Sequence, residues 1–217
     1  MAQRVRVHNL SLSLDGYTAG PDQDAANPLG VGGPLLHEWI FATQTGQAML
    51  GGSGGQTGID DDFARQGFEG IGATVIGRNM FGPVRGPWGN SDWRGWWGEE
   101  PPYHHPVFVV THHTRSPLVM KGGTTFHFVT EGVEVALQRA LETARGADVG
   151  VGGGASTIRQ LLQAGRIDEL HLAVVPVLLR SGERLFAEPR EVPTGYECVR
   201  FVGSDAVAHY VLQRKDA

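Results

Sequence analysis

Asp148-Val149-Gly150-Val151-Gly152-Gly153-Gly154-Ala155-Ser156-Thr157 is the stretch of sequence that decides the fold. It runs from a short strand-like segment into residues with the apolar spacing of a helix. The glycines carry no side chains, so backbone N–H groups can approach a phosphate there, and the helix start adds its positive dipole end. Ser156 and Thr157 add hydroxyl groups at the same place. The stretch predicts a phosphate-binding turn, and a tight turn without a ligand is the alternative.

The same stretch matches Gly-x-Gly-x-x-Ala, the fingerprint of the Rossmann dinucleotide-binding fold, through Gly150, Gly152 and Ala155. That fingerprint belongs to the first strand–helix turn of a Rossmann unit, and an acidic residue follows about 20 positions later at the end of a strand. Here Asp168 and Glu169 come before the next strand-like segment, and too little chain remains for the rest of such a domain. We therefore reject a Rossmann fold.

Working outward from the turn, the apolar periodicity predicts strands and helices that alternate along the chain. Strands are expected at residues 4–14, with an irregularity near Asn9, and at 73–76, 107–111, 126–129, 148–151 and 169–179. Helices are expected at residues 34–49, 59–68, 131–145 and 155–164, and a closing hairpin at 196–202 and 206–212. This order predicts an α/β fold in one domain spanning residues 1–217. Its central sheet is expected to be mostly parallel but mixed, with helices on both faces and a C-terminal antiparallel hairpin.

The composition is that of an ordinary globular protein, with 41% hydrophobic and 19% charged residues among 217. The net charge is −5 and no basic stripe is present, so we expect no nucleic-acid partner. The single cysteine, Cys198, cannot form a disulfide framework and suits a reducing cytoplasm. We find no signal-peptide pattern and no run of about 18 apolar residues, so we expect a cytoplasmic protein that does not enter a membrane.

Four segments together resemble one protein family. They are Ser13-Leu14-Asp15-Gly16-Tyr17-Thr18-Ala19-Gly20, Val75-Ile76-Gly77-Arg78-Asn79, Val151-Gly152-Gly153-Gly154, and Asp168-Glu169-Leu170 through Pro176-Val177-Leu178-Leu179 to Gly182-Glu183-Arg184-Leu185-Phe186. In order and spacing they are similar to the reductase domain of the bifunctional riboflavin-biosynthesis deaminase–reductase and to related stand-alone proteins with a dihydrofolate-reductase-like fold. Together the segments cover most of the chain, and the last is the most specific.

The resemblance implies a dihydrofolate-reductase-like fold with NADPH lying across the ends of the sheet strands. It implies that the pyrophosphate is held by Gly152, Gly153, Gly154, Ala155 and Ser156. Gly77 and Arg78 would open a second helix toward phosphate, and Thr111 would begin the loop under the adenosine end. In that loop His112, His113 and Arg115 are the candidates for the 2′-phosphate, because a dianion favours cationic or donor partners. A solvated basic turn is the alternative.

The zinc deaminase half of the riboflavin enzyme is not carried over, because its His-x-Glu and Pro-Cys-x-x-Cys signature is missing. His37 and Glu38 are adjacent, and Cys198 stands alone. Only reductase chemistry is therefore implied. The segments at residues 51–58 and 83–102 look like additions to the family core, which leaves the substrate open.

A reductase of this kind needs a group that supplies or relays a proton, since the hydride chemistry belongs to the cofactor. Asp15, in the loop after the first strand, is the first candidate for catalysis and substrate contact, and an aspartate that caps a turn is the alternative. Glu38 is the second catalytic candidate, because the first helix of dihydrofolate reductases carries the substrate-binding carboxylate. For Glu38 the alternative is a surface helix residue.

Residues 83–102 contain four of the five tryptophans, Trp88, Trp93, Trp96 and Trp97. They fit a lid that stacks on a flat heterocycle, with Trp88 contacting the substrate and Phe81 lining the same cleft. Two alternatives stay open, a hydrophobic cluster that pins the long loop and part of a dimer face.

Two patterns that suggest other chemistry are set aside. Gly51-Gly52-Ser53-Gly54-Gly55 fits Gly-x-Ser-x-Gly, but a nucleophile elbow follows a strand, and the preceding residues have helical spacing. His104-His105 and His112-His113 suggest a metal, but neighbouring strand residues point to opposite faces and cannot easily chelate one ion. We expect no metal site.

The sequence thus predicts an NADPH-dependent reductase of a small planar heterocycle such as a pterin, pyrimidine or flavin-like compound. One alternative is a non-catalytic nucleotide- or ligand-binding module on the same fold. The other is the 5-amino-6-(5-phosphoribosylamino)uracil reductase of riboflavin biosynthesis, which must also hold a ribose phosphate; Arg85 and Arg94 are the nearby candidates. The family resemblance suggests a homodimer, with residues 196–212 as the candidate contact.

Overall fold

The computed structural model describes residues 2–83, 85–89, 92–186 and 194–215. The chain divides into two compact units, each made of two separate pieces of sequence. Unit 1 comprises Met1–Arg6 and Gly70–Ile167, and unit 2 comprises Val7–Glu69 and Asp168–Ala217. Strand β1 (Val5–Ser13) begins in unit 1 and continues in unit 2. The single domain expected from the sequence stays a prediction.

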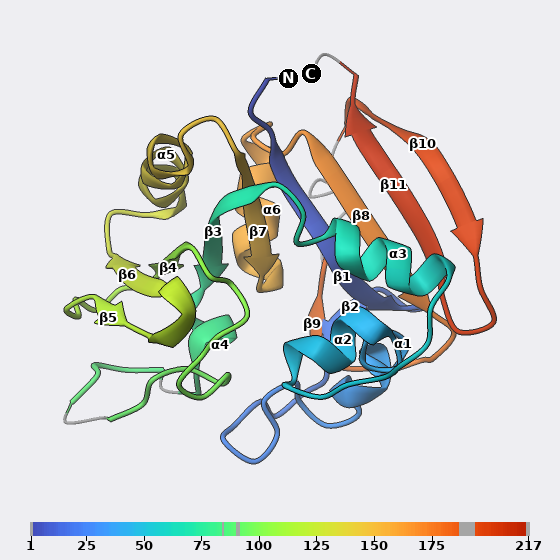
Figure 1. Cartoon of the computed structure of the whole chain (residues 1–217), viewed down its shortest axis with the longest axis horizontal. Helices are drawn as coiled ribbons and strands as arrows, with labels where there is room; N and C mark the ends of the chain where they lie inside the picture. The colour runs from blue at the N-terminus through green and yellow to red at the C-terminus, as the bar shows by residue number, and fades with distance from the viewer. Residues whose placement is uncertain (1, 84, 90–91, 187–193, 216–217) are drawn as a thin grey trace. The chain divides into compact units, whose positions relative to one another are not determined.

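Unit 1 is built on a mostly parallel sheet (Figure 1). Its strand order is β1, β7 (Asp148–Gly153), β3 (Ile71–Gly77), β4 (Pro106–Val110), β6 (Thr125–Val129) and β5 (Leu118–Val119). All neighbouring strands are parallel except β5, which pairs antiparallel with β6. Buried valine, isoleucine and phenylalanine side chains dominate β3, β4 and β6, as expected for strands covered by helices.

Three helices of unit 1 follow strands of this sheet. Helix α5 (Val133–Ala144) packs on β3, β4 and β6, and it does so through buried apolar residues at helical spacing. Helix α6 (Ala155–Gln163) packs on β7 and β3. Helix α4 (Arg78–Phe81) is a single turn after β3, and a short 3-10 helix, η2 (Lys121–Gly123), precedes β6. The ends of β3 and β7 thereby enter helices side by side.

The sheet of unit 2 has the order β10 (Tyr196–Gly203), β11 (Ala208–Arg214), β8 (Glu169–Val175) and the remainder of β1. Strand β11 is antiparallel to both β10 and β8, which confirms the predicted closing hairpin. A second, two-stranded sheet joins β2 (Tyr17–Ala19) to β9 (Glu183–Arg184). In Figure 1, β8, β11 and β10 run side by side from orange to red.

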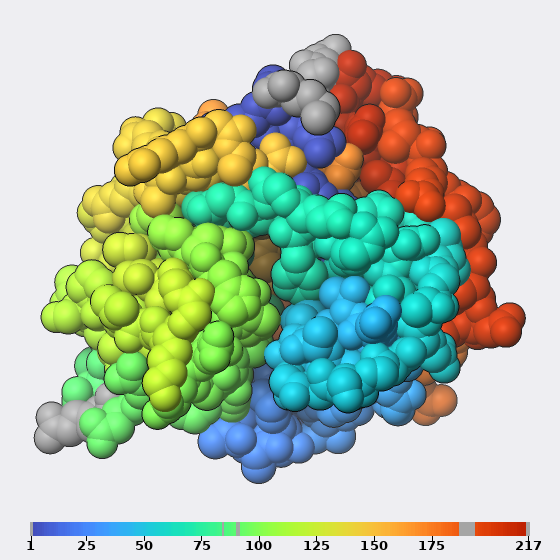
Figure 2. All heavy atoms as spheres, in the orientation of Figure 1, coloured from blue at the N-terminus to red at the C-terminus, as the bar shows by residue number. Residues whose placement is uncertain are grey.

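The helices of unit 2 are short. They are the 3-10 helix η1 (Gly33–Leu36) and the helices α1 (Glu38–Phe41), α2 (Gln44–Met49) and α3 (Ile59–Gln66). Helices α1, α2 and α3 pack against one another, and their atoms form one mass from blue to teal in Figure 2. They cover a core that includes Leu36, Trp39, Ile40, Ala64 and Ala173.

The single helix predicted for residues 34–49 is wrong, because this segment is broken into η1, α1 and α2. Thr43 has extended backbone, with φ −77° and ψ 161°, and its side chain accepts a hydrogen bond from the Gly46 N–H. Thr43 therefore starts a new helix as its N-cap. A Cβ on Gly46 would lie 1.9 Å from the Ile40 carbonyl oxygen, so the close approach of α2 to α1 requires glycine.

The strand predicted at residues 169–179 ends at Val175, because Pro176 has no N–H to continue a ladder. The short strands β2, β5 and β9 were not predicted. The irregularity expected near Asn9 coincides with a left-handed backbone there, at φ 55°. The fold class itself is confirmed: a mostly parallel mixed sheet with helices packed on it and an antiparallel C-terminal hairpin. Among the described residues, no helix has the length and apolar character needed to span a membrane.

Candidate dinucleotide-binding site

The glycine turn between β7 and α6 leaves open space beside its backbone. A Cβ placed on Gly153 or Gly154 would meet no atom within 4 Å. Gly153 also has φ +110°, a conformation that favours glycine. A bare backbone that faces open space at a helix start is the arrangement that a phosphate needs. The structure thus fits the phosphate-binding turn predicted from the sequence.

The first turn of α6 supplies donors at this turn. Gly154 is the N-cap and no side chain caps the helix, while the N–H groups of Thr157 and Ile158 bond to the Gly154 carbonyl. By helix geometry the N–H groups of Ala155 and Ser156 have no acceptor within the helix. Ser156 is exposed, whereas Ala155 and Thr157 are buried. Backbone donors, the helix dipole and the Ser156 hydroxyl can therefore act on one anion.

Gly77 joins this turn to the next part of the site. A Cβ on Gly77 would lie 2.6 Å from Thr157 Oγ1 and 3.2 Å from the Gly154 nitrogen, so only glycine lets β3 end this close to the turn. Arg78 follows directly. Because α4 is one turn long, it offers no helix dipole of consequence, and the contribution of this segment is the Arg78 side chain.

Arg78 is held by three neutral groups. Its Nη1 donates to Thr111 Oγ1 (2.7 Å), its Nη2 donates to the Gly86 carbonyl (2.8 Å), and its guanidinium carbon lies 3.1 Å from the centre of the Trp88 ring. Its buried Nε has no hydrogen-bond partner among the described residues. Burial, followed by the charges of Arg115 and Arg85, lowers the pKa of Arg78 to about 10, so it remains charged at neutral pH.

The loop after β4 lies beside Arg78. Thr111 is buried, its N–H bonds to the Val129 carbonyl, and its hydroxyl also accepts from the His113 N–H at 3.3 Å. His112 is exposed and His113 is half-buried. Arg115 donates through Nη2 to the Trp93 carbonyl (2.7 Å). The structure therefore brings together Arg78 with the loop residues predicted for the 2′-phosphate.

Pairwise charge interactions link four arginines of unit 1, Arg78 with Arg115 and Arg85, and Arg115 with Arg94. The charges that shift the pKa of Arg78 are those of Arg115 and Arg85, and after burial the charge of Arg94 lowers the pKa of Arg115. Like charges held this close repel, and an anion bound among them relieves the repulsion. We call these four residues the arginine cluster. Arg85 and Arg94, the sequence candidates for a ribose phosphate, belong to this cluster.

The predicted contacts of Phe81 and Trp88 with substrate do not agree with their burial. Phe81 is 0% and Trp88 8% exposed, and both belong to the hydrophobic core of unit 1. Trp93 and Trp97 pack against the same core, and Trp96 lies edge-on to Trp93. Trp88, Trp93 and Trp97 thus belong to or pack against a hydrophobic cluster, in line with one of the alternatives that the sequence left open. Sequence reasoning did not foresee that Trp88 lies under Arg78.

Unit 2 contains the two predicted catalytic carboxylates. Asp15 accepts hydrogen bonds from the N–H groups of Leu179 (3.1 Å) and Arg180 (2.7 Å). A hydrogen bond from the Ser13 side chain, followed by these backbone bonds, lowers the pKa of Asp15, so it is ionised at neutral pH. Glu38 is exposed on the first turn of α1. Asp15 thus binds the backbone of the distant segment after β8, and these two bonds are not those of an aspartate that caps its own turn.

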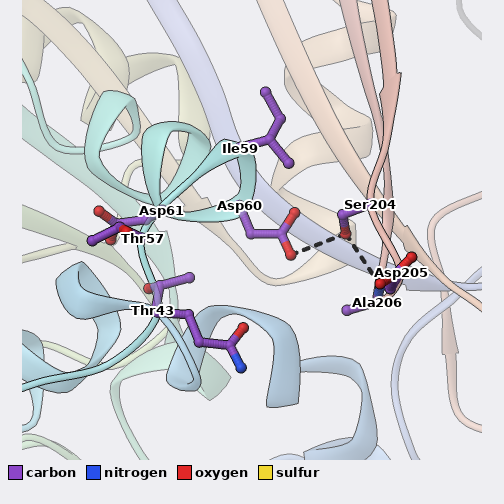
Figure 3. Close-up of a pocket in the computed structure, with 9 residues that line it drawn as sticks. Thr43, Thr57, Ile59, Asp60, Asp61, Ser204, Asp205 and Ala206 are labelled. Atoms are coloured by element: carbon purple, nitrogen blue, oxygen red, sulfur yellow. Dashed lines mark hydrogen bonds between the residues drawn. The ribbon is translucent and has the colours of Figure 1, made fainter.

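Unit 2 also has a cavity of about 210 Å³ between the start of α3 and the loop between β10 and β11 (Figure 3). Asp60 and Ser204 point toward each other there, and the Ser204 hydroxyl donates to Asp60 at 2.9 Å. Asp60 also accepts from His209, and Asp61 accepts from the Thr45 N–H. Because both carboxylates accept hydrogen bonds from groups within the protein, we assign no ligand to the cavity. Among the described residues, no three His, Cys, Asp or Glu side chains are grouped to hold a metal ion.

Comparisons with known proteins give one family and several similar folds. The "Putative riboflavin biosynthesis protein" of Shewanella sp. PV-4 is 21% identical, with a TM-score of 0.60 over 99% of each chain. The diaminohydroxyphosphoribosylaminopyrimidine deaminase/5-amino-6-(5-phosphoribosylamino)uracil reductase of Thermotoga maritima is 14% identical, with a TM-score of 0.56 over 98% of this chain and 57% of that one. Dihydrofolate reductase from Enterococcus faecalis, complexed with NADP(H) and RAB-propyl, is 13% identical, with a TM-score of 0.53 over the whole of both chains.

At these identities the likeness to solved structures is one of fold. Comparison with curated proteins gives no match. The family model for the RibD C-terminal domain matches residues 7–207, which is nearly the whole chain and includes the glycine turn, Arg78 and Asp15. The chain therefore belongs to the RibD C-terminal domain family.

Proposed function

We propose that this protein is an NADPH-dependent reductase of a small planar heterocycle. The observation that carries the proposal is the junction, within unit 1, of an open glycine turn and the arginine cluster through Gly77 and Arg78. One half suits a pyrophosphate and the other suits an additional phosphate, as a 2′-phosphorylated dinucleotide requires. Membership of the RibD C-terminal domain family and the NADP(H) bound by the dihydrofolate reductase of similar fold support the proposal.

The residues present fit this cofactor. Gly152, Gly153 and Gly154, with the N–H groups of Ala155 and Ser156 and the nearby Thr157, would hold the pyrophosphate. Arg78 and Arg115, with Thr111, His112 and His113, would hold the 2′-phosphate. When bound, NADPH supplies the hydride.

Asp15 and Glu38 are the proposed catalytic carboxylates. The hydrogen bonds to Asp15 favour its ionised form. Asp15 is therefore better suited to accept or relay a proton than to act as a general acid that is protonated in the free enzyme. Its bonds to the N–H groups of Leu179 and Arg180 also fix the segment after β8. Glu38 is exposed, so its proposed role requires that a bound substrate cover its side chain.

A narrower candidate is the 5-amino-6-(5-phosphoribosylamino)uracil reductase reaction named for the Thermotoga maritima protein. The family match favours this substrate. The arginine cluster bears on its ribose phosphate, because Arg85 and Arg94 interact with the two arginines that we assign to the 2′-phosphate. A reductase that accepts unphosphorylated heterocycles needs no such second site.

We further propose that the protein is a cytoplasmic homodimer. Strand β10 ends the sheet of unit 2 and is exposed along most of its length, with Val199 47% and Phe201 60% exposed. An apolar edge strand of this kind is normally covered, and a second copy of the hairpin is the simplest cover. Light scattering on the wild type and on Phe201→Lys tests the dimer, which the lysine should dissociate.

The location in the cytoplasm is proposed because the free, exposed Cys198 suits a reducing compartment.

Turnover is tested by following the loss of NADPH absorbance with a panel of pterins, flavins and pyrimidines, including the phosphoribosylamino compound. We expect consumption with at least one member, and loss of most activity in Asp15→Asn with cofactor affinity retained. NADPH binding without turnover of any member would favour the binding module. Absence of binding would contradict the proposal at its base.

A further inference from the structure

Trp88 occupies an unusual position for a residue of the added segment at 83–102. Its side chain is buried, and its Nε1–H donates to the His113 carbonyl at 2.9 Å. Its ring packs edge-to-face against Phe81 and Phe128, with centroids 5.7 and 5.1 Å away. One indole therefore links the core of unit 1 to the loop after β4.

The same ring carries two cations. The guanidinium carbon of Arg78 lies 3.1 Å, and that of Arg115 4.8 Å, from the Trp88 ring centre. An aromatic face attracts a cation through its quadrupole, and indole does so more strongly than the other side chains. This attraction offsets the repulsion between two guanidinium groups that would otherwise move apart. Trp88 is thus the neutral platform on which two members of the arginine cluster are held.

Holding Arg78 in place has a consequence for anion binding. An arginine side chain normally loses much rotamer freedom when it binds a ligand, which weakens the affinity. Here Trp88, Thr111 and the Gly86 carbonyl fix the guanidinium before any ligand arrives. The Arg78 side chain therefore loses its conformational entropy when the protein folds and not when the ligand binds.

We propose that Trp88 is a positioning residue that sets the preference of this site for 2′-phosphorylated over unphosphorylated dinucleotides. It acts through Arg78 and Arg115 and contacts neither the nicotinamide nor the substrate. The inference rests on the proposed function, because it presumes that the arginine cluster binds the 2′-phosphate. It assigns to the added segment a role in cofactor selection.

The test compares two substitutions at this position. Trp88→Met fills most of the space with a flexible apolar side chain but removes the aromatic face, and Trp88→Phe keeps an aromatic face without the N–H group. Trp96→Met is the matched control, since Trp96 lies in the same segment, contacts the α4 backbone and, among the described residues, stacks on no arginine of the cluster. Calorimetric titration with adenosine 2′,5′-bisphosphate and 5′-AMP, then with NADPH and NADH, gives the affinity ratio for each variant, and circular dichroism checks folding.

In Trp88→Met we expect the ratio to fall by about five- to tenfold, with 5′-AMP affinity unchanged, because Arg78 must then lose its rotamer freedom on binding. Trp88→Phe should restore most of the ratio, and Trp96→Met should keep it. A general structural role would weaken the binding of both ligands alike.

Should the methionine variant unfold, tryptophan fluorescence of the wild type and of Trp88→Phe gives a second readout. The bisphosphate should then change tryptophan emission more in wild type than in Trp88→Phe, and an equal change would overturn the inference.

The outcomes distinguish failure of the inference about Trp88 from failure of the proposed function. A wild type that prefers the bisphosphate, with the same ratio in Trp88→Met, overturns the inference and leaves the proposed function standing. A wild type that binds both dinucleotides equally overturns the inference and the assignment of the 2′-phosphate. A wild type that binds neither overturns the proposed function itself.

Discussion

The guanidinium of Arg78 rests on the indole of Trp88, with 3.1 Å between the guanidinium carbon and the ring centre. The charged neighbours that shift the pKa of Arg78 are arginines, and burial acts in the same direction. With a pKa of about 10 it is still charged at pH 7. A partly buried cation in the field of other cations costs free energy, which an anionic ligand recovers.

Replacement of Arg78 by methionine is expected to weaken NADPH binding by roughly 10- to 100-fold, the usual worth of a charged hydrogen bond. NADH affinity should change by less than about threefold, because NADH lacks the 2′-phosphate. Since the repulsion from Arg115 and Arg85 disappears, the free energy of unfolding should not fall by the amount usual for a lost arginine. Isothermal titration and urea unfolding measure the two effects. Arg139→Met, on the exposed face of α5, is the control.

Ser156 tests the phosphate site at the start of α6. Ser156→Glu places a negative charge at the helix N-terminus, where it should leave stability unchanged or raise it by about 0.5 kcal/mol. The same charge should repel a pyrophosphate and weaken NADPH and NADH alike by about tenfold or more. The neutral isostere Ser156→Gln should retain most of the affinity. Equal affinity of the two variants would place the pyrophosphate elsewhere.

A buried histidine pair in unit 2 predicts a stability that depends on pH. The Asn9 N–H donates to His171 Nδ1 (3.1 Å), so His171 Nε2–H must donate to His209 Nδ1 (3.0 Å), and His209 Nε2–H to Asp60 (2.9 Å). Both histidines are thus neutral in the folded protein. Burial, with further contributions from the other charged groups nearby, lowers the pKa of His171 to about 2, and burial lowers that of His209.

Because the folded-state pKa of His171 lies below the ordinary value of about 6.5, the unfolded chain takes up protons first as the pH falls. The free energy of unfolding should therefore decrease below about pH 6.5, by up to about 1.4 kcal/mol per pH unit for each histidine. Urea titrations at pH 7.5 and 5.5 measure it. His171→Gln should be less stable at pH 7.5 but lose less on acidification than wild type. An equal loss would show that other groups control the acid sensitivity.

The break between α1 and α2 can be tested at Thr43, whose side chain is buried and caps the Gly46 N–H at 2.9 Å. Thr43→Ala should lower the free energy of unfolding by about 1 to 2 kcal/mol, the usual cost of losing an N-cap. Thr43→Ser keeps the hydroxyl and should recover most of the loss in chemical denaturation. A serine variant as unstable as the alanine variant would mean that the methyl group, not the cap, matters.

Periodicity predicted the parallel strands and the long helices because each buries a regular apolar face. It failed where a single contact determines where a helix begins or ends. The helix at residues 34–49 breaks because Thr43 caps a new helix and Gly46 contacts the Ile40 carbonyl, and neither feature changes the hydrophobic spacing. The two-residue strands β5 and β9 are too short to show a period.

The candidate site divides in the same way. The glycine turn was predictable because its three glycines stand directly between a strand-like segment and a segment with helical spacing. The arginine cluster was not, because Arg78, Arg94 and Arg115 are far apart in sequence and come together only in the fold, where Arg78 and Arg115 lie over the Trp88 ring. That packing also buries Phe81 and Trp88, which their positions in the sequence did not predict. The number of aromatic residues in a loop does not reveal which of them are covered.

The most direct test of the central claim is a calorimetric titration of the purified protein with NADPH and with NADH. We expect binding of NADPH in the micromolar range and of NADH at least about tenfold more weakly, because one phosphate in a cationic site is worth at least about 1.4 kcal/mol. Equal affinities would contradict the role given to the arginine cluster. If neither dinucleotide bound, the assignment of the protein as an NADPH-dependent reductase would be contradicted.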